Sequence, residues 1–358
     1  MTTTKDYLSL EQKKPPLIII KSPLLGKKYM TITNNDKNRT KCILITGVAG
    51  FIGSYLAHKF LKNGYRVVGI DILSDYYDIL IKKKRVLELE QYCSFSYYFD
   101  DICDSKRFHM LCTKYKPDLV VHLAAQAGVI VSENLIPNYI KSNIYGTEVV
   151  VQECSHEHIP LLYASSSSVY GDCPNIPFRE TDLELRPKSL YASSKLHNER
   201  IAEFYHKHLG LTAVGLRFFS IYGENMRPDM AISKFTSAIY HQKPITLYGD
   251  DNTARDFTYI HDLIHIMLLI TQKLLNKESL APIYNIGNQS PVPITQVIEI
   301  LSSLLNKTTK ITRMPLRIGE SQITYSDSSL LYQHFKYCPN TPIEEGLRNY
   351  TNWYLKNL

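Results

Sequence analysis

The sequence of 358 residues has few features of secreted or membrane proteins. Its seven cysteines form no Cys-x-x-Cys pair, and their odd number does not suit a framework of disulfides. This cysteine usage predicts a reducing compartment, so we expect the protein to be cytoplasmic. No stretch approaches the roughly 18 to 20 apolar residues that cross a bilayer, and we therefore expect no membrane partner.

The sequence also has no motif typical of metal or nucleic-acid binding. Histidines in Cys154–Pro160 and His206–His208 stand two apart, which splays them to different faces of a helix, so we predict surface residues and no metal site. The net charge of +7 is partly local, in residues 1–40 and in Lys82–Arg85. Because no nucleic-acid motif accompanies this charge, we interpret it as a basic tail and a solvated face.

From Lys41 onward, short apolar runs alternate with helical patterns. Residues 41–46, 65–71, 117–125, 159–165 and 211–220 predict strands, and residues 54–64, 138–158 and 189–210 predict helices. This alternation predicts an α/β fold with a doubly wound parallel sheet (Rossmann) and helices on both faces.

After about residue 222 the segments shorten and proline and glycine become frequent. We therefore expect an N-terminal extension (1–40), a nucleotide-binding domain (41–222) and a smaller mixed α/β substrate-binding lobe (223–358). Some segments of that lobe are expected to return to the first domain. A cleft should lie between the two, above the carboxyl ends of the strands.

Three glycines and one acid indicate a dinucleotide site. Gly47, Gly50 and Gly53 lie between the first strand and the first helix, where backbone amides and the helix dipole can hold a pyrophosphate. Asp71 follows the next strand, eighteen residues beyond Gly53. Its carboxylate can accept both ribose hydroxyls of an adenosine and would repel a 2′-phosphate, which favours NAD over NADP.

The run Ser165–Ser168 ends an apolar stretch, so it predicts a row of hydroxyls at the cleft rather than a linker. Tyr191 and Lys195 form a Tyr-x-x-x-Lys pattern, which places both on one helix face. The spacing alone is weak evidence, because Tyr332 and Lys336 repeat it where no other chemistry is expected. Only Tyr191 follows a serine row at the end of a predicted strand.

Together these motifs resemble the extended short-chain dehydrogenase/reductase family from Lys41 to the C-terminus, through "ITGVAGFIG", "HLAAQAGV", "SSSSVYG", "YASSK", "RFFSIYG", "RDFTYIHD" and "YNIGN". The resemblance implies that Tyr191 is the catalytic base, that Lys195 binds the nicotinamide ribose and lowers the pKa of Tyr191, and that Ser166 holds the reacting hydroxyl. It also implies a homodimer formed by helices within 138–154 and 191–205. The implied NAD-binding residues are Gly47, Gly50, Phe51, Ile52, Gly53, Asp71, Asp101, Ile102, Ala124, Ala125, Gln126, Asn143, Tyr191, Lys195 and Phe218. For Asp101 an acid in a loop is an equal alternative.

Ser167 and Ser168 stand where dehydrating and decarboxylating relatives carry acids, so those reactions are disfavoured. Within the family the chain is most similar to UDP-glucuronate 4-epimerases, through "DILSDYYD" and "RPDMAISKF". The resemblance implies NAD-dependent conversion of UDP-glucuronate to UDP-galacturonate through a 4-keto sugar. Arg227 would hold the uronate carboxylate in an orientation that resists loss of carbon dioxide; an exposed loop arginine is the alternative. The implied substrate-binding residues are Ser166, Ser167, Ser168, Tyr191, Ser220, Arg227, Arg255 and Arg317, the last two at the diphosphate.

Several positions depart from the family pattern. His261 stands in place of an aspartate, Asn225-Met226 in place of Trp-Gly, and Ile130 in place of an arginine. These departures bear on the substrate more than on the reaction. UDP-N-acetylglucosamine or UDP-glucose 4-epimerisation therefore stays open as an alternative, and a non-catalytic NAD-binding sensor is a further one.

Overall fold

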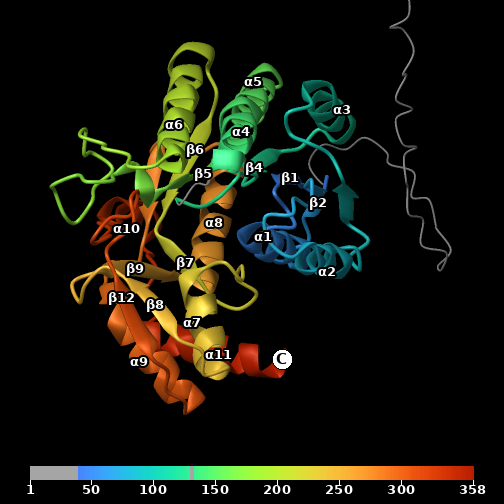
Figure 1. Ribbon diagram of the computed structural model, residues 1–358. Coiled ribbons are helices and arrows are strands. Elements are labelled where there is room, and N and C mark those ends of the chain that lie inside the picture. Colours follow the sequence, from blue (N-terminus) through green and yellow to red (C-terminus); the bar gives the residue numbers. More distant parts are fainter. Residues whose placement is uncertain (1–38, 130–132) are drawn as a thin grey trace, which may run out of the picture. The chain divides into compact units, whose positions relative to one another are not determined.

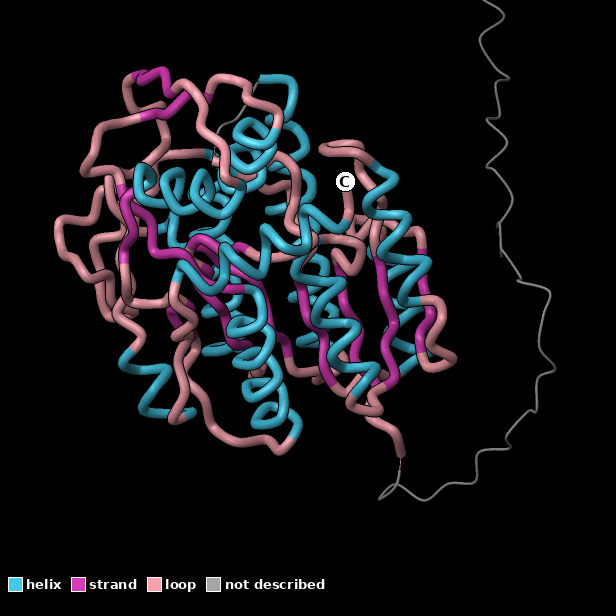
Figure 2. Tube along the Cα trace, turned by 90° about the horizontal axis from the view of Figure 1, so that it is seen from below, coloured by secondary structure: helices cyan, strands magenta, loops and turns pink. Residues whose placement is uncertain are grey.

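The computed structural model describes residues 39–129 and 133–358. Almost all of the expected N-terminal extension, and Ile130, lie outside these described residues. Residues 40–358 form one compact unit, and Figures 1 and 2 show its arrangement from two sides. None of the helices described is both long and apolar enough to span a membrane.

A sheet of seven parallel strands forms the centre of this unit, in the order β10-β6-β5-β4-β1-β2-β3. Figure 2 shows these strands side by side between helices. The doubly wound parallel sheet predicted from the sequence is confirmed. Its strands are β1 (Cys42–Thr46), β2 (Arg66–Ile70), β3 (Phe95–Tyr98), β4 (Leu119–His122), β5 (Leu161–Ser166), β6 (Ala213–Phe218) and β10 (Ile283–Ile286).

Alternate side chains of the strands enter two different cores. In β1, Ile43 and Ile45 belong to one buried cluster, whereas Cys42 and Leu44 belong to another. The first cluster includes residues of α1 (Phe51–Lys62) and α8 (Ile260–Leu275). The second includes residues of α3 (Ser105–Tyr115), α5 (Gly146–His156) and α6 (Leu190–Leu209). Because successive side chains of a strand point to opposite faces, both faces of the sheet are covered.

Two small sheets lie beside the large one. The first consists of β7 (Ser220–Tyr222), β9 (Ala254–Tyr259) and β11 (Pro291–Pro293), and the second pairs β8 (Ile245–Tyr248) with β12 (Ile311–Met314). The remaining helices are α2 (Ile79–Leu89), α4 (Ile136–Asn138), α7 (Ala231–Tyr240), α9 (Ile294–Leu305), α10 (Ser329–Phe335) and α11 (Ile343–Lys356). Figure 1 shows α7, α9 and α11 grouped with β8 and β12.

Local signals explain how α6 is bounded. The Ser189 side chain accepts a hydrogen bond from the backbone N–H of Ala192 at 3.1 Å, which caps the first turn. Gly210 ends the helix in the left-handed region, at φ 72°, where a residue without Cβ is unstrained. Tyr191 and Lys195 therefore lie in the first two turns of a well-defined helix.

Three features differ from the sequence predictions. Strands β3 and β10, of four residues each, were not predicted. The helix expected over 138–158 begins as a π-helix (Tyr139–Tyr145) before α5. The interpretation of Lys82–Arg85 as a solvated face is wrong for half of the run. Lys83 and Lys84 are exposed, but only 6% of Lys82 and 4% of Arg85 is accessible, because both side chains form hydrogen bonds to neighbouring segments.

Candidate active site

A cavity of about 1070 Å³ lies at the carboxyl ends of the central strands. The ends of β2, β5 and β6 contribute to its wall, and residues of β7, β8 and β9 contribute as well. Every residue that the sequence placed in the cofactor or substrate site lines this cavity, except Asn143, Ser167 and Ser168. The cleft expected above the strands is therefore present.

The glycine turn forms one end of the cavity. A Cβ on Gly53 would lie 2.2 Å from the carbonyl oxygen of Gly47, and one on Gly47 would lie 2.7 Å from the backbone nitrogen of Ala124. Helix α1 begins at Phe51 with no side-chain cap and no acidic residue in its first turn. The unscreened helix N-terminus and the close backbone approach fit a pyrophosphate group.

Asp71 is fixed at the end of β2 by backbone hydrogen bonds. Its Oδ2 accepts from the N–H of Ala49 at 3.0 Å and its Oδ1 from the N–H of Leu73 at 2.8 Å. Burial raises the pKa of Asp71, and these hydrogen bonds act against the rise. Asp71 lines the cavity, and each of its oxygens has capacity for a second hydrogen bond, so the carboxylate can still accept from ribose hydroxyls.

Asp101 is paired rather than free. Its Oδ2 lies 2.7 Å from Nζ of Lys141, which also lines the cavity, and its Oδ1 accepts from the N–H of Cys103 at 3.0 Å. Burial alone would raise the pKa of Asp101, but the bonds from Lys141 and Cys103 outweigh it and lower the pKa. Asp101 and Lys141 therefore form an ion pair with no net charge at this part of the cavity.

Asn143 lies beneath the cavity instead of in its wall. Its side chain accepts from the N–H of Gln126 at 2.7 Å and donates to the carbonyl of Gln126 at 3.0 Å and to Oγ of Ser194 at 3.1 Å. The π-helix turn carries this fully buried amide to that position. Asn143 thus ties the loop after β4 to the residue next to Lys195.

The serines of the run Ser165–Ser168 make different contacts. Ser165 Oγ donates to Glu199 at 2.5 Å, and Ser166 lines the cavity next to it. Ser168 donates to Oγ of Ser166 at 2.9 Å, and its backbone N–H does so at 3.2 Å. Ser167 and Ser168 do not line the cavity, so Ser168 supports Ser166 rather than reaching a ligand.

Tyr191 and Lys195 both face the cavity. Nζ of Lys195 donates to the carbonyl of Ala164 at 2.9 Å and lies 5.9 Å from the centre of the Tyr191 ring. Burial lowers the pKa of Lys195 to about 8. Burial also raises the pKa of Tyr191, while the charge of Arg227 and a hydrogen bond with Ser166 act against that rise.

The second Tyr-x-x-x-Lys pattern shows how little the spacing alone decides. Nζ of Lys336 lies 5.9 Å from the ring of Tyr332, the same distance as in the first pair. Neither residue lines the cavity, and 53% of Tyr332 is exposed. Position relative to the sheet, and not spacing, therefore separates the two pairs.

Arg227 lies in the loop before α7 and is already paired. Its Nε donates to Oδ1 of Asp229 at 2.9 Å and its Nη2 donates to Oδ2 at 2.8 Å. The guanidinium also lies 5.6 Å from the centre of the Tyr76 ring. All three residues line the cavity, so the group is neither free nor an exposed loop arginine.

Two further arginines line the part of the cavity formed by the small sheets. Nη1 of Arg255 donates to the carbonyls of Ala254 at 2.9 Å and Gln322 at 3.1 Å. Arg317 stacks 4.2 Å from the centre of the Tyr248 ring and pairs with Glu320 at 2.5 Å. Two cations in one wall suit a diphosphate.

Ser220, the first residue of β7, lines the same cavity.

Some cavity residues were not predicted from the sequence. Tyr76, Asp229, Lys234 and Tyr248 all line the cavity. A signal existed for the first three, because they belong to the motifs "DILSDYYD" and "RPDMAISKF". For Tyr248, in a short strand of a small sheet, the sequence offered none.

Among the residues described, one group has donor atoms close enough for a metal ion: His109, Glu153 and Glu157. It lies on the outer side of α3 and α5 and does not line the cavity. Nδ1 of His109 already contacts Glu153 at 2.9 Å. The expectation of no metal site stays a prediction.

A parallel sheet with a glycine turn after β1, an acid after β2 and a tyrosine-lysine pair above β5 defines a dinucleotide-dependent α/β enzyme. The chain belongs to the NAD dependent epimerase/dehydratase family, whose model matches residues 43–287. This confirms the expected family and NAD as its cofactor.

Individual relatives are similar over nearly the whole described unit. A UDP-glucuronate 4-epimerase of Thermodesulfobacterium geofontis is 37% identical over 88% of this chain and 96% of its own length. The crystal structure of a Bacillus cereus UDP-glucuronic acid 4-epimerase with UDP-glucuronic acid and NAD has a TM-score of 0.82 and 31% identity, covering 88% of this chain and 100% of its own. A Thermotoga maritima UDP-glucose 4-epimerase with UDP-glucose has a TM-score of 0.80 and 25% identity, covering 88% and 99%. These findings confirm the expected class, an NAD-dependent sugar-nucleotide epimerase.

Proposed function

We propose that this chain interconverts UDP-glucuronate and UDP-galacturonate by NAD-dependent epimerisation at C4. The observation that carries the substrate is the place of Arg227. Its charge acts on the hydroxyl of Tyr191, and both side chains line one cavity. In a uronate the carboxylate is bound to C5, next to the C4 hydroxyl. A base for C4 and a cation for the carboxylate must therefore lie in one cavity, close to a single sugar ring, and the presence of both side chains in this cavity supports the assignment.

Three groups of this chain would share the work at C4, and one of them, Tyr191, would transfer the proton. Tyr191 takes the proton of the C4 hydroxyl as the sugar is oxidised and returns it after the keto sugar has turned over. Ser166, held by Ser168, positions the hydroxyl. Lys195 lies on the same helix face as Tyr191 and would bind the ribose of the cofactor. NAD, when bound, takes up the hydride from C4 and returns it to the other face.

Holding the carboxylate matters because the 4-keto form of a uronate is a β-keto acid, which readily loses carbon dioxide. A guanidinium can fix the carboxylate so that its bond to C5 is not aligned with the carbonyl π system. Asp229 binds Nε and Nη2 of Arg227, so the carboxylate of the substrate would bind the N–H groups of the edge that Nη1 forms with Nη2. No acid stands next to Ser166 to promote elimination, because Ser167 and Ser168 follow it.

The direct test is product analysis. Purified protein is incubated with UDP-glucuronate, and UDP-galacturonate is separated by chromatography. We expect interconversion without UDP-pentose, and Arg227→Gln should allow UDP-pentose to form while slowing epimerisation. Absence of turnover of UDP-glucuronate, together with turnover of UDP-N-acetylglucosamine, would overturn the substrate assignment.

A neutral hexose is the second candidate, and the Arg227–Asp229 pair is the observation in its favour. With Asp229 bound to it, Arg227 brings no net charge to the cavity. The fold is also similar to that of the Thermotoga maritima UDP-glucose 4-epimerase. Competition between UDP-glucose and UDP-glucuronate for one protein sample distinguishes the two candidate functions. An enzyme for uronates prefers UDP-glucuronate, because it contacts the carboxylate.

We further propose a homodimer that uses the π-helix, α5 and α6. Figure 1 shows α5 and α6 side by side, and both pack on the same face of the large sheet. Ile140, Tyr145 and Phe204, on the π-helix and α6, each expose about half of their surface. Light scattering should give twice the chain mass, and Phe204→Glu should shift it toward the monomer. Cytoplasmic location stays a prediction, in line with seven free cysteines.

A further inference from the structure

Arg85 is a buried cation that the catalytic scheme does not use. It lies on α2, outside the cavity wall, and only 4% of its surface is exposed. Nη1 donates to the carbonyl of Ala49 at 3.0 Å and to the hydroxyl of Tyr77 at 2.8 Å, and Nη2 donates to the carbonyl of Asn225. These partners come from three segments that are far apart in the sequence.

Two of those segments carry the chemistry of the site. Ala49 belongs to the glycine turn, and its N–H is held by Asp71, so both sides of this residue are fixed. Asn225 lies two residues before Arg227 and has a positive φ of 55°, which asparagine tolerates better than most residues. One rigid guanidinium therefore joins the cofactor turn to the loop of Arg227.

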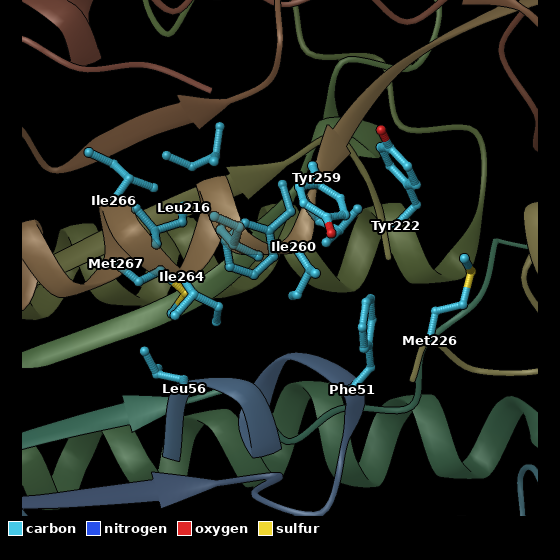
Figure 3. Packing of buried hydrophobic residues seen from close by; sticks show 14 of the residues in the cluster. Phe51, Leu56, Leu216, Tyr222, Met226, Tyr259, Ile260, Ile264, Ile266 and Met267 are labelled. Atoms are coloured by element: carbon cyan, nitrogen blue, oxygen red, sulfur yellow. The ribbon is translucent and has the colours of Figure 1, made fainter. Parts of the chain in front are cut away.

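An apolar contact region supports the same junction. Met226 and Phe51 belong to one buried cluster, and Figure 3 shows both side chains between the start of α1 and the neighbouring loop. Only 5% of the Met226 surface is exposed, so its side chain is packed inside this cluster. The loop of Arg227 is thus joined to the glycine turn by the hydrogen bonds of Arg85, and residues of both segments belong to one apolar cluster.

The cation has an unusual set of partners. Its hydrogen-bond acceptors among the described residues are two carbonyls and a hydroxyl, none of them a carboxylate. Its Nε is buried with no hydrogen-bond partner in the same part of the chain. The nearby carboxylate of Asp71 acts on this charge only through space, so the direct contacts of Arg85 are those that join the three segments.

We propose that Arg85 is a positioning residue that holds the Arg227 loop in register with the cofactor turn. Because Arg85 also binds the glycine turn, the position of Arg227, and with it recognition of the substrate carboxylate, would depend on the structure of the NAD site. This inference rests on the proposed uronate function. A lysine cannot replace it, because a single ammonium group does not reach both carbonyls as a planar fork does.

The test compares Arg85→Gln with Lys84→Gln, an exposed position on the same helix. Affinities of the full chain for UDP-glucuronate and for UDP are measured by calorimetry, and retained NAD is measured by absorbance after denaturation. We expect Arg85→Gln to weaken UDP-glucuronate at least tenfold while UDP changes less than threefold, and to lower NAD occupancy. Lys84→Gln should resemble the parent in all three.

A double variant separates positioning from a general structural effect. If Arg85 acts through Arg227, Arg85→Gln combined with Arg227→Gln binds UDP-glucuronate no more weakly than Arg227→Gln alone. Additive losses, or equal weakening of UDP and UDP-glucuronate, would overturn the inference. If Arg85→Gln does not fold, Arg85→Lys keeps the charge and is expected to show the same selective loss.

The two proposals fail in different ways. A parent protein that binds UDP and UDP-glucuronate equally contradicts the uronate function itself. A parent that prefers UDP-glucuronate, with an Arg85→Gln variant that keeps that preference, contradicts only the positioning role. The NAD occupancy of Arg85→Gln against Lys84→Gln tests the link to the cofactor turn in either case.

Discussion

Arg227 and Asp229 form a two-point ion pair inside the cavity, with both carboxylate oxygens of Asp229 bound by Nε and Nη2. This pair uses the edge of the guanidinium that carries Nε and Nη2. Asp229 does not bind the other edge, which carries Nη1. The family resemblance had implied a cation for the substrate. What the fold presents is a neutral pair whose second edge can still bind a carboxylate.

Asp229→Asn should therefore tighten the binding of UDP-glucuronate. The variant removes a negative charge from the cavity wall, where repulsion between two unit charges about 10 Å apart is about 1.5–2 kcal/mol at an effective dielectric constant near 20. The side-chain amide of the new asparagine can still accept one hydrogen bond from Arg227. The contact between the Arg227 guanidinium and the Tyr76 ring is unchanged. We expect KM to fall about tenfold in low salt and less in high salt. A higher KM would mean that Asp229 acts mainly by orienting Arg227.

Tyr191→Phe should lower kcat by about 10²–10⁴ and leave the affinity for UDP-glucuronate nearly unchanged. The chain supplies its own control in Tyr332→Phe, which removes the hydroxyl of the second Tyr-x-x-x-Lys pattern on the surface. That variant should keep full activity, as followed by product chromatography. Full activity of Tyr191→Phe would contradict the assignment of the base.

The sequence was sufficient for the sheet and for the cofactor end of the cavity because both depend on local patterns. Apolar runs mark strands such as β1. Gly53 must be glycine because the carbonyl group of Gly47 leaves no room for a side chain. Strand β10 could not be predicted in the same way. It becomes a strand only by pairing with β6, about seventy residues earlier in the chain.

The paired state of Arg227 could not be predicted either. Whether Asp229 folds back onto Arg227 depends on the course of a loop, and the sequence gives only two charges two residues apart. The same holds for Lys82–Arg85, where a surface interpretation failed for the two residues on the buried side of α2. Helical spacing allows such a split, but only the packing of α2 shows which side is covered.

Lys195→Met should abolish activity and stabilise the fold at pH 7. The fall of the pKa of Lys195 from 10.5 to about 8 on burial corresponds to a cost of about 3 kcal/mol when the lysine is charged. Loss of its bond to Ala164 offsets roughly 1 kcal/mol of the gain.

The pH dependence checks this account. Below pH 8 both folded and unfolded lysine are protonated, so the full cost is present. Between pH 8 and 10.5 the unfolded chain binds more protons, so the parent gains stability as pH rises while Lys195→Met does not. Urea unfolding at pH 7 and pH 9.5 should therefore show the difference between parent and variant shrinking. A difference that stays constant would show that Lys195 is not buried as a costly charge.

Glu199→Gln should be strongly destabilising, by about 3–5 kcal/mol in urea unfolding. Glu199 on α6 binds Arg217 of β6 through two hydrogen bonds of 2.9 and 2.8 Å, and their side chains are only 10% and 5% exposed. The amide leaves Arg217 charged and buried without its counter-ion. Arg200→Gln, which breaks the exposed pair with Glu203 on the same helix, is the control and should change stability by less than 1 kcal/mol.

The double variant Glu199→Met with Arg217→Met distinguishes the value of the pair from the penalty of a lone charge. It removes both charges, so it should recover most of the stability that Glu199→Gln loses. Tyr170 and Ser165 would each lose a partner, which limits the recovery. If the double variant were less stable than Glu199→Gln, the pair itself would be the main attachment of α6 to the sheet, and the spacing of Tyr191 above β5 would depend on it directly.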